Sequence, residues 1–153
     1  MRRNDPPHIV VIEDHPEYLD YVATLLRRAG YAVATFTKGT EALRYLEHNP
    51  AGVVVTDVFM PEMDGFEVLK EVRRRFPELP IIGVSGGGPL MPMCLDAMQS
   101  LGANATFAKP VDADALLIAI ARLSATPTDR PHDESIVSAV ESRALPRSRQ
   151  HRK

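Results

Sequence analysis

The sequence predicts an α/β protein in which five parallel β-strands alternate with five helices. Short β-branched runs such as 52–56 (Gly-Val-Val-Val-Thr) have the composition of strands that are covered on both faces. Between these runs, apolar residues recur at the spacing of a helix. Regular alternation of this kind implies right-handed crossovers and a doubly wound parallel sheet with helices on both faces.

The expected strands are short runs of mostly apolar and β-branched residues. In chain order they are His8–Ile12, Ala32–Phe36, 52–56, 80–84 and Ala105–Ala108. Asp57 follows the third run and Ser85 follows the fourth. Each run has four or five residues, which is close to the length of an ordinary strand.

The expected helices are bounded by residues that start or stop a helix. Pro16 stands where a first turn tolerates proline, and Asp112 can cap the last helix. Gly30 and Gly102 close the first and fourth helices. The predicted ranges are 16–29, 39–49, 66–75, 90–101 and 112–123. In the first helix, the residues at helical spacing are Tyr18, Tyr21, Val22, Leu25 and Leu26.

Length and composition indicate one globular domain. The chain has 153 residues, of which 44% are hydrophobic and 25% charged, close to the averages for such domains. A net charge of -2 excludes a general basic field for nucleic acid. Cys94 is the single cysteine, which excludes an internal disulfide. With no signal peptide and no apolar run of bilayer length, we expect a cytoplasmic protein without a membrane span.

The two ends of the chain differ from this domain. Residues 1–7 form an N-terminal extension, and we expect the domain to occupy residues 8–124. Residues 125–153 are rich in Pro, Ser, Asp and Arg, and five basic residues with no acidic one follow Ser142. We expect this basic tail to be disordered. About thirty residues are too few for a DNA-binding or enzymatic output domain, so a stand-alone domain is expected.

Polar residues follow four of the five expected strands. Glu13 and Asp14 come after the first strand, Asp57 after the third, Ser85 after the fourth and Lys109 after the fifth. Ligands of doubly wound sheets bind outside the carboxyl ends of the strands. The sequence therefore predicts that three carboxylates, a hydroxyl and an ammonium group converge in one crevice.

The chemistry of this set fits phosphoryl transfer. Three nearby carboxylates repel one another, and a hard cation with oxygen ligands such as Mg²⁺ relieves the repulsion. One carboxylate can then act as a nucleophile on a phosphoryl group. Ser85 and Lys109 can bind the remaining phosphoryl oxygens as a hydrogen-bond donor and a point charge.

Four segments of the chain resemble response-regulator receiver domains of two-component signalling. They are Val10-Val11-Ile12-Glu13-Asp14, residues 55–65 (VTDVFMPEMDG), Val84-Ser85-Gly86 and Phe107-Ala108-Lys109-Pro110. The segments occur in the family's order and at its spacing, and the resemblance covers residues 8–123. It implies the flavodoxin-like strand order 2-1-3-4-5.

The resemblance also implies a role for each matching residue. Asp57 is the implied phosphoacceptor, and Ser85, Lys109 and Phe107 are the implied phosphoryl-binding and switch residues. The implied Mg²⁺ ligands are Glu13, Asp14, Asp57 and the backbone carbonyl of Phe59. Phe59 is a departure, because a polar side chain often stands at this position in the family and a bulky ring there would shield the site.

The implied partners are a histidine kinase or a histidine phosphotransfer protein as donor, and a downstream protein as target. Such a protein is a signalling switch and not an enzyme, although slow autodephosphorylation is possible. The expected output surface is the face formed by the fourth helix, fifth strand and fifth helix, which could also form a homodimer. The apolar residues there, including Met91, Leu95 and Met98, fit a wide core face equally well.

Simpler interpretations and other functions were weighed against this one. Alone, Phe107 could simply pack in its strand, and His8, His15 and Cys94 are expected to be bystanders. A binding module without phosphorylation would lack the acceptor, an acid or the lysine, and all are present. A dehalogenase-like phosphatase would carry an acid in place of Phe59. A flavodoxin-like cofactor domain would need a phosphate loop where Glu13 and Asp14 stand.

Overall fold

The structure, a computed structural model, describes residues 7–124 and contains five strands and five helices there. The strands are β1 (His8–Ile12), β2 (Ala32–Phe36), β3 (Val53–Asp57), β4 (Ile81–Ser85) and β5 (Ala105–Ala108). The helices are α1 (Pro16–Arg28), α2 (Gly39–Leu46), α3 (Gly65–Arg75), α4 (Met91–Ser100) and α5 (Ala113–Ser124). The extension 1–7, apart from Pro7, and the tail 125–153 lie outside the described residues, so both remain predictions.

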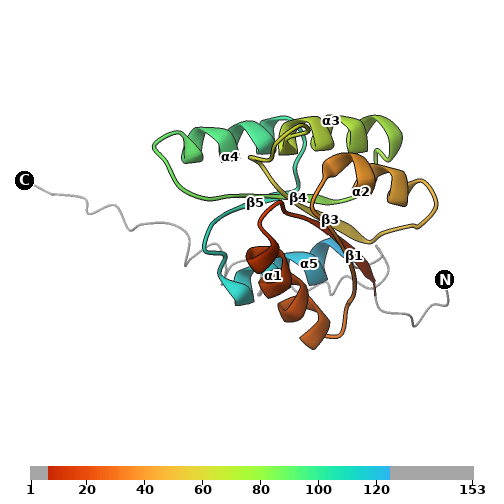
Figure 1. Ribbon diagram of the computed structural model, residues 1–153. Helices are drawn as coiled ribbons and strands as arrows, with labels where there is room; N and C mark the ends of the chain where they lie inside the picture. The colour runs from red at the N-terminus through yellow and green to blue at the C-terminus, as the bar shows by residue number, and fades with distance from the viewer. Residues whose placement is uncertain (1–6, 125–153) are drawn as a thin grey trace, which may run out of the picture.

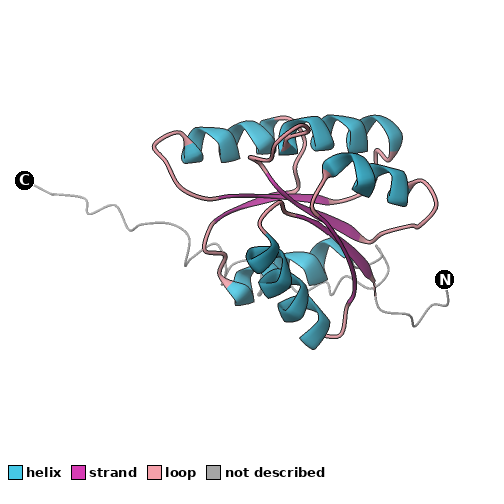
Figure 2. Cartoon of the chain, viewed as in Figure 1, coloured by secondary structure: helices cyan, strands magenta, loops and turns pink. Residues whose placement is uncertain are grey.

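The strands form one parallel sheet in the order β2-β1-β3-β4-β5. Helices α1 and α5 cover one face, and α2, α3 and α4 cover the other (Figures 1 and 2). The predicted fold class and strand order are confirmed. The chain adds β2 on one side of β1 and β3 on the other. The carboxyl ends of β1 and β3 therefore border the crevice where such folds bind ligands.

Alternating side chains of the strands feed two hydrophobic cores, one on each face of the sheet. In β1, Val10 and Ile12 pack toward α2, α3 and α4, whereas Ile9 and Val11 pack toward α1 and α5. All residues of β3 and β4 are buried, which explains why the sequence of these strands shows no polar alternation.

The strand ends differ from the prediction by one residue. Asp57 and Ser85 are the last residues of β3 and β4, because both strands begin and end one position later than expected. α2 ends at Leu46, three residues before the predicted stop, and Asn49 donates a side-chain hydrogen bond to the Tyr45 carbonyl of that last turn.

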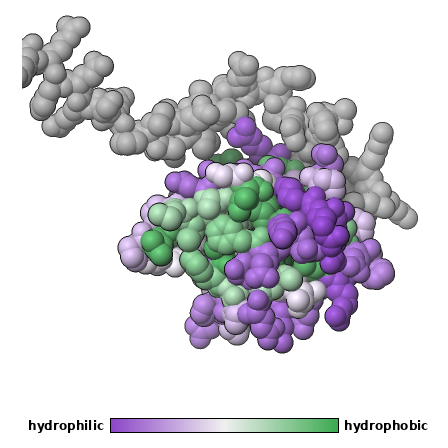
Figure 3. All heavy atoms as spheres, turned by 90° about the horizontal axis from the view of Figure 1, so that it is seen from above, coloured by the Kyte–Doolittle hydropathy of each residue, from purple (hydrophilic) through white to green (hydrophobic). Residues whose placement is uncertain are grey.

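The core face of α1 differs in part from the prediction, and the structure decides which residues of α4 face the core. In α1, Leu19 and Val22 are buried, whereas Tyr21 is 50% exposed. In α4, Met98 is fully buried, and Met91 and Leu95 are half-buried. The exposed apolar residues of this segment are instead Leu90, Met93 and Leu101, and Figure 3 shows apolar side chains gathered over one part of the α2–α3–α4 layer. Cys94 is half-buried against the core.

The described helices include none that is both long and apolar enough to cross a membrane.

Arg73 of α3 joins three segments at the edge of the sheet opposite the predicted site. Its guanidinium donates two hydrogen bonds to the Gly102 carbonyl, at 3.1 and 2.7 Å, and one to the Leu79 carbonyl at 2.6 Å. A fourth, of 2.7 Å, goes to Asn104 Oδ1, which in turn accepts a bond from the Ile81 backbone N–H. The Arg73 contacts therefore hold the ends of α3 and α4 and the start of β4 together.

We expect Arg73→Ala to lower the free energy of unfolding by about 2 kcal/mol, because it removes the charged donor from the partly buried Leu79 carbonyl and from the exposed Gly102 carbonyl. Arg74→Ala is the matched control, since Arg74 is exposed and pairs with Glu71 on the surface. That change should cost at most about 0.5 kcal/mol. Urea unfolding of both variants checks the difference, and equal losses would contradict the role given to Arg73.

Candidate functional site

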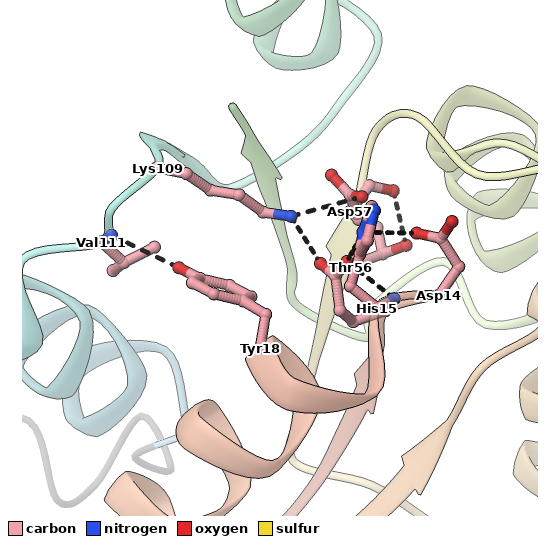
Figure 4. A network of polar contacts seen from close by, with 8 residues as sticks. Asp14, His15, Tyr18, Thr56, Asp57, Lys109 and Val111 are labelled. Atoms are coloured by element: carbon pink, nitrogen blue, oxygen red, sulfur yellow. Dashed lines mark hydrogen bonds and ion pairs between the residues drawn. The ribbon is translucent and has the colours of Figure 1, made fainter. Parts of the chain in front are cut away.

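The carboxyl edge of the sheet gathers the predicted site residues. Glu13 and Asp14 directly follow β1, Asp57 ends β3, and Lys109 directly follows β5. Figure 4 shows the side chains of Asp14, Asp57 and Lys109 converging from these three strand ends. Parallel register brings this about, since Ile12 pairs with Thr56 and Asp57 pairs with Val84.

Lys109 bridges two buried carboxylates. Its Nζ lies 2.7 Å from Glu13 Oε2 and 3.4 Å from Asp57 Oδ2. Burial opposes the positive charge, but the hydrogen bond to Glu13 and the charge of Asp57 outweigh it, so the pKa of Lys109 is raised. Lys109 is therefore a fixed positive charge beside Asp57.

Asp57 is a buried carboxylate held close to a like charge. Its exposed fraction is 5%, and burial together with the charge of Glu13 raises its pKa from 3.8 to about 6, against the opposing influence of Lys109. At pH 7 the group is mostly ionised, and it is destabilised by its surroundings. A cation bound beside Asp57 would relieve that destabilisation.

His15 also contacts the acidic cluster, contrary to the expectation that it is a bystander. Its Nδ1 lies 2.9 Å from Glu13 Oε1 and 3.3 Å from Asp14 Oδ1. The hydrogen bond to Glu13 and the charges of Asp14 and Glu13 raise the pKa of His15. The sequence signal that could have predicted this contact is the position of His15 directly after Glu13 and Asp14, which keeps its side chain within reach of both.

Ser85 and Phe107 lie beside this cluster on β4 and β5. Ser85 is fully buried, and its Oγ has no hydrogen-bond partner among the described residues. Phe107 is half-buried, packs against the core under α1 and α5, and pairs in register with Val84. Its position fits simple packing as well as a switch, so its role remains a prediction.

A hollow of about 590 Å³ opens above Asp57. Its walls include three aromatic side chains, of Tyr18, Tyr21 and Phe59, together with Lys109 and Gly86. Phe59 is 51% exposed, so its ring stands at the rim of the hollow. Tyr18 and Tyr21 were assigned to a core face from the sequence, and their place beside the site was missed because α1 lies far from Asp57 in the chain.

The residues present fit a divalent cation. Ligand atoms of Glu13, Asp14, His15 and Asp57 lie within 4.8 Å of one another. Asp14 Oδ1 is buried and accepts no hydrogen bond among the described residues, although His15 Nδ1 lies 3.3 Å away, so this oxygen can serve as a ligand. Carboxylate oxygens are the ligands that Mg²⁺ prefers in proteins.

A model of one protein family, described as the response regulator receiver domain, matches residues 9–121. The chain belongs to this family. The matched range contains all four segments that resemble receiver domains, so the predicted family is confirmed. Receiver domains are the signalling switches of two-component systems.

Curated relatives of this receiver domain are larger regulators. The transcriptional regulatory protein GlrR of Escherichia coli (strain K12) is 35% identical over 136 residues, which cover 87% of this chain and 30% of GlrR. The C4-dicarboxylate transport transcriptional regulatory protein DctD of Rhizobium meliloti (strain 1021) is 37% identical over 111 residues, covering 72% of this chain and 24% of DctD. The chain thus spans less than a third of either relative.

Solved receiver domains share the fold. A response regulator receiver domain protein from Clostridium thermocellum superposes with a TM-score of 0.71 at 33% identity. The match covers 77% of this chain and 94% of that one. The two proteins therefore share the order of the strands and the arrangement of the helices.

The raised pKa of Asp57 gives the metal-free receiver domain a testable pH dependence. A carboxyl group whose pKa is higher in the folded state binds more protons there, so stability is lost as the pH rises from about 4 to about 6. We expect Asp57→Asn to remove this loss and to raise the free energy of unfolding at pH 7 by up to about 3 kcal/mol. Urea unfolding in a chelator at several pH values checks it. Parallel curves for the wild type and the variant would contradict the prediction.

Proposed function

We propose that this receiver domain accepts a phosphoryl group on Asp57 from a phosphohistidine donor, with Mg²⁺ as cofactor. The observation that carries the proposal is the position of the Asp57 carboxylate, which is buried at the carboxyl end of β3, 3.4 Å from the Lys109 ammonium group that also binds Glu13. Few functions other than phosphoryl acceptance need a nucleophilic carboxylate, further acids and an ammonium group at one strand edge.

The proposed step is a transfer between two side chains. An Asp57 carboxylate oxygen forms a bond to phosphorus while the phosphorus–nitrogen bond of the donor breaks. The electron pair of that bond stays on the imidazole nitrogen, which then takes up a proton. With a pKa of about 6, Asp57 is ionised at neutral pH and needs no general base.

Glu13, Asp14 and Asp57, with the backbone carbonyl of Phe59, would hold the Mg²⁺ ion. When bound, the ion supplies positive charge that offsets the charge of the carboxylates and the phosphoryl oxygens. Asp14 Oδ1, which accepts no hydrogen bond among the described residues, and the raised pKa of Asp57 support this assignment.

Ser85, Lys109 and Phe107 are the proposed switch residues. Ser85 Oγ has no partner among the described residues, so its hydroxyl can donate to a phosphoryl oxygen after a change of rotamer. Lys109 can exchange its contact with Asp57 for one with the phosphoryl group. We infer that Phe107 turns inward as Ser85 moves, and that the α4–β5–α5 face changes with it.

The proposed partners follow from this switch. A histidine kinase or histidine phosphotransfer protein would supply the phosphoryl group, and a downstream protein would read the α4–β5–α5 face. A homodimer through α4 and α5 is a further possible state of that face, to which Leu101 and Ile118 contribute exposed apolar surface. A cytoplasmic location remains an expectation from the sequence.

The test is the intact mass of the protein after incubation with Mg²⁺ and acetyl phosphate, beside Asp57→Ala. We expect one phosphoryl group on the wild type and none on the variant. Omitting Mg²⁺ should prevent the addition. Modification of Asp57→Ala to the same extent would overturn the choice of acceptor, and addition in a chelator would overturn the metal requirement.

Phe59 offers a prediction on the lifetime of the aspartyl phosphate. Its half-exposed ring borders the hollow above Asp57, where it limits the approach of an attacking water. We expect Phe59→Ala to shorten the half-life of the phosphorylated protein roughly tenfold. The decay of the phosphorylated mass after removal of the donor measures this half-life, with Tyr21→Ala, which also removes a ring from the hollow, as a comparison. An unchanged half-life in Phe59→Ala would contradict the shielding role.

A further inference from the structure

Tyr18 makes two separate contacts with the segment that carries Lys109. The Lys109 Nζ lies 4.5 Å from the centroid of the Tyr18 ring, and the Tyr18 hydroxyl accepts a 3.3 Å hydrogen bond from the Val111 backbone N–H. Figure 4 shows the Tyr18 side chain rising from α1 beside this segment. Neither contact was visible in the sequence motifs, which do not include Tyr18.

The ring contact restricts a side chain that is otherwise flexible. Lysine places its charge on a four-carbon stem with many rotamers. Here Nζ is enclosed by Glu13 at 2.7 Å, Asp57 at 3.4 Å and the face of the Tyr18 ring. A cation is attracted to the face of an aromatic ring, so the ring favours the position of Nζ that also reaches Asp57.

The hydroxyl contact restricts the backbone of the same segment. Val111 stands two residues after Lys109, its side chain is buried, and its N–H precedes the first turn of α5. On its other side, the Lys109 N–H donates to the Ser85 carbonyl at 2.8 Å. The turn from β5 to α5 is thus held at two residues, at Lys109 by the Ser85 carbonyl and at Val111 by the Tyr18 hydroxyl.

We propose that Tyr18 is the positioning residue for Lys109. Its ring holds the Lys109 ammonium group near Asp57, and its hydroxyl holds the turn on which Lys109 stands. The role rests on the proposed function, because Lys109 matters for phosphoryl transfer only if Asp57 is the acceptor. Tyr18 acts through Lys109, and no direct contact with the phosphoryl group is assigned to it.

Two substitutions separate the contacts. Tyr18→Phe keeps the ring beneath Nζ and removes the bond to Val111, whereas Tyr18→Leu removes both. Tyr21→Leu is the matched control, because Tyr21 lies on the same helix, borders the same hollow and packs its ring 5.9 Å from that of Tyr18, whereas the cation–π contact of Lys109 is with Tyr18. Melting curves of all three establish that each is folded at the assay temperature.

The kinetic readout is the rate of phosphorylation by acetyl phosphate at saturating Mg²⁺, followed by intact mass. We expect Tyr18→Leu to slow it about tenfold or more, because a displaced Nζ no longer neutralises the incoming phosphoryl group. Tyr18→Phe should recover most of the rate, and Tyr21→Leu should stay within about twofold of the wild type. The Mg²⁺ dissociation constant, from calorimetry, should not change beyond about twofold in any of them.

A spectroscopic readout is independent of phosphorylation. The Tyr18 ring should shift the Lys109 ε-methylene protons upfield through its ring current, and this shift should persist in Tyr18→Phe and disappear in Tyr18→Leu. Lys109→Arg identifies the resonance among the four lysines of the chain. Wild-type phosphorylation in Tyr18→Leu, an equal loss in Tyr21→Leu, or an unshifted resonance in the wild type would overturn the proposal. A failure of the proposed function would give a different result: the wild type would show the ring-current shift but would not be phosphorylated.

Discussion

Lys109→Ala is expected to separate the stability of the site from its activity. In the metal-free protein the variant leaves Glu13 and Asp57 buried side by side without their cation, at exposed fractions of 3% and 5%. Removing one partner of a buried charge pair costs about 3–5 kcal/mol, and we expect the lower end because Asp57 can take up a proton below pH 6. Mg²⁺ should restore most of this stability, since it supplies positive charge to the same carboxylates.

Activity should not recover in the same way. We expect phosphorylation of Lys109→Ala at saturating Mg²⁺ to be slower by about a hundredfold or more, because the metal does not replace the donor on the Lys109 side of the phosphoryl group. Urea unfolding with and without Mg²⁺, beside intact-mass time courses, measures both effects. Lys38→Ala, at the exposed N-cap of α2, is the control and should change neither. Recovery of both properties with Mg²⁺ would show that Lys109 is needed only for charge balance.

Gly65→Ala is expected to displace the backbone of Asp57 and so to disturb the site. A Cβ at this position would collide with the Asp57 carbonyl oxygen and would lie 2.7 Å from Val58 Cα. Both are backbone atoms, so β3 or the start of α3 must move. We expect a loss of roughly 2–4 kcal/mol in the free energy of unfolding and a clear fall in phosphorylation rate, since the moving atoms belong to Asp57 itself.

Lys70→Ala on the exposed side of the same helix controls for the change in α3 and should leave both properties nearly unchanged. A Gly65→Ala protein with normal stability and normal phosphorylation would mean that the start of α3 is not packed as tightly against Asp57 as the distances indicate. Normal stability with a slowed reaction would instead place the whole effect on the geometry of the acceptor.

The fold and the clustering of the acids were predictable from short-range features of the sequence. A parallel sheet places the carboxyl ends of its strands at one edge, so residues that follow the strands, such as Glu13, Asp57 and Lys109, are brought together by the fold itself. Composition identified the strands and periodicity identified the helices. The boundary of β3 was missed by one residue, since a buried carboxylate does not look like the end of a strand.

What the sequence did not predict depends on how helices are rotated about their axes. In α1, Val22 is buried as expected and Tyr18 packs partly against the core, but Tyr21 is exposed and Leu19 is buried. In α4, the apolar positions left the core face undecided, and the structure buries Met98 and exposes Leu90. The need for glycine at position 65 was equally hidden, because a close approach of two backbones has no signature in local sequence.

The attachment of α4 at its two ends is unequal, and this asymmetry gives the helix a pivot. Beyond its last turn, the Gly102 carbonyl is held by two bonds from Arg73 and the Asn104 N–H by the Ile81 carbonyl. Before its first turn come Gly86, Gly87 and Gly88, of which the latter two have left-handed backbone angles and open space around them. A disturbance that begins at Ser85 therefore reaches α4 at its loose end, so Leu90 and Met93 would swing through the widest arc while Leu101 stays nearly still.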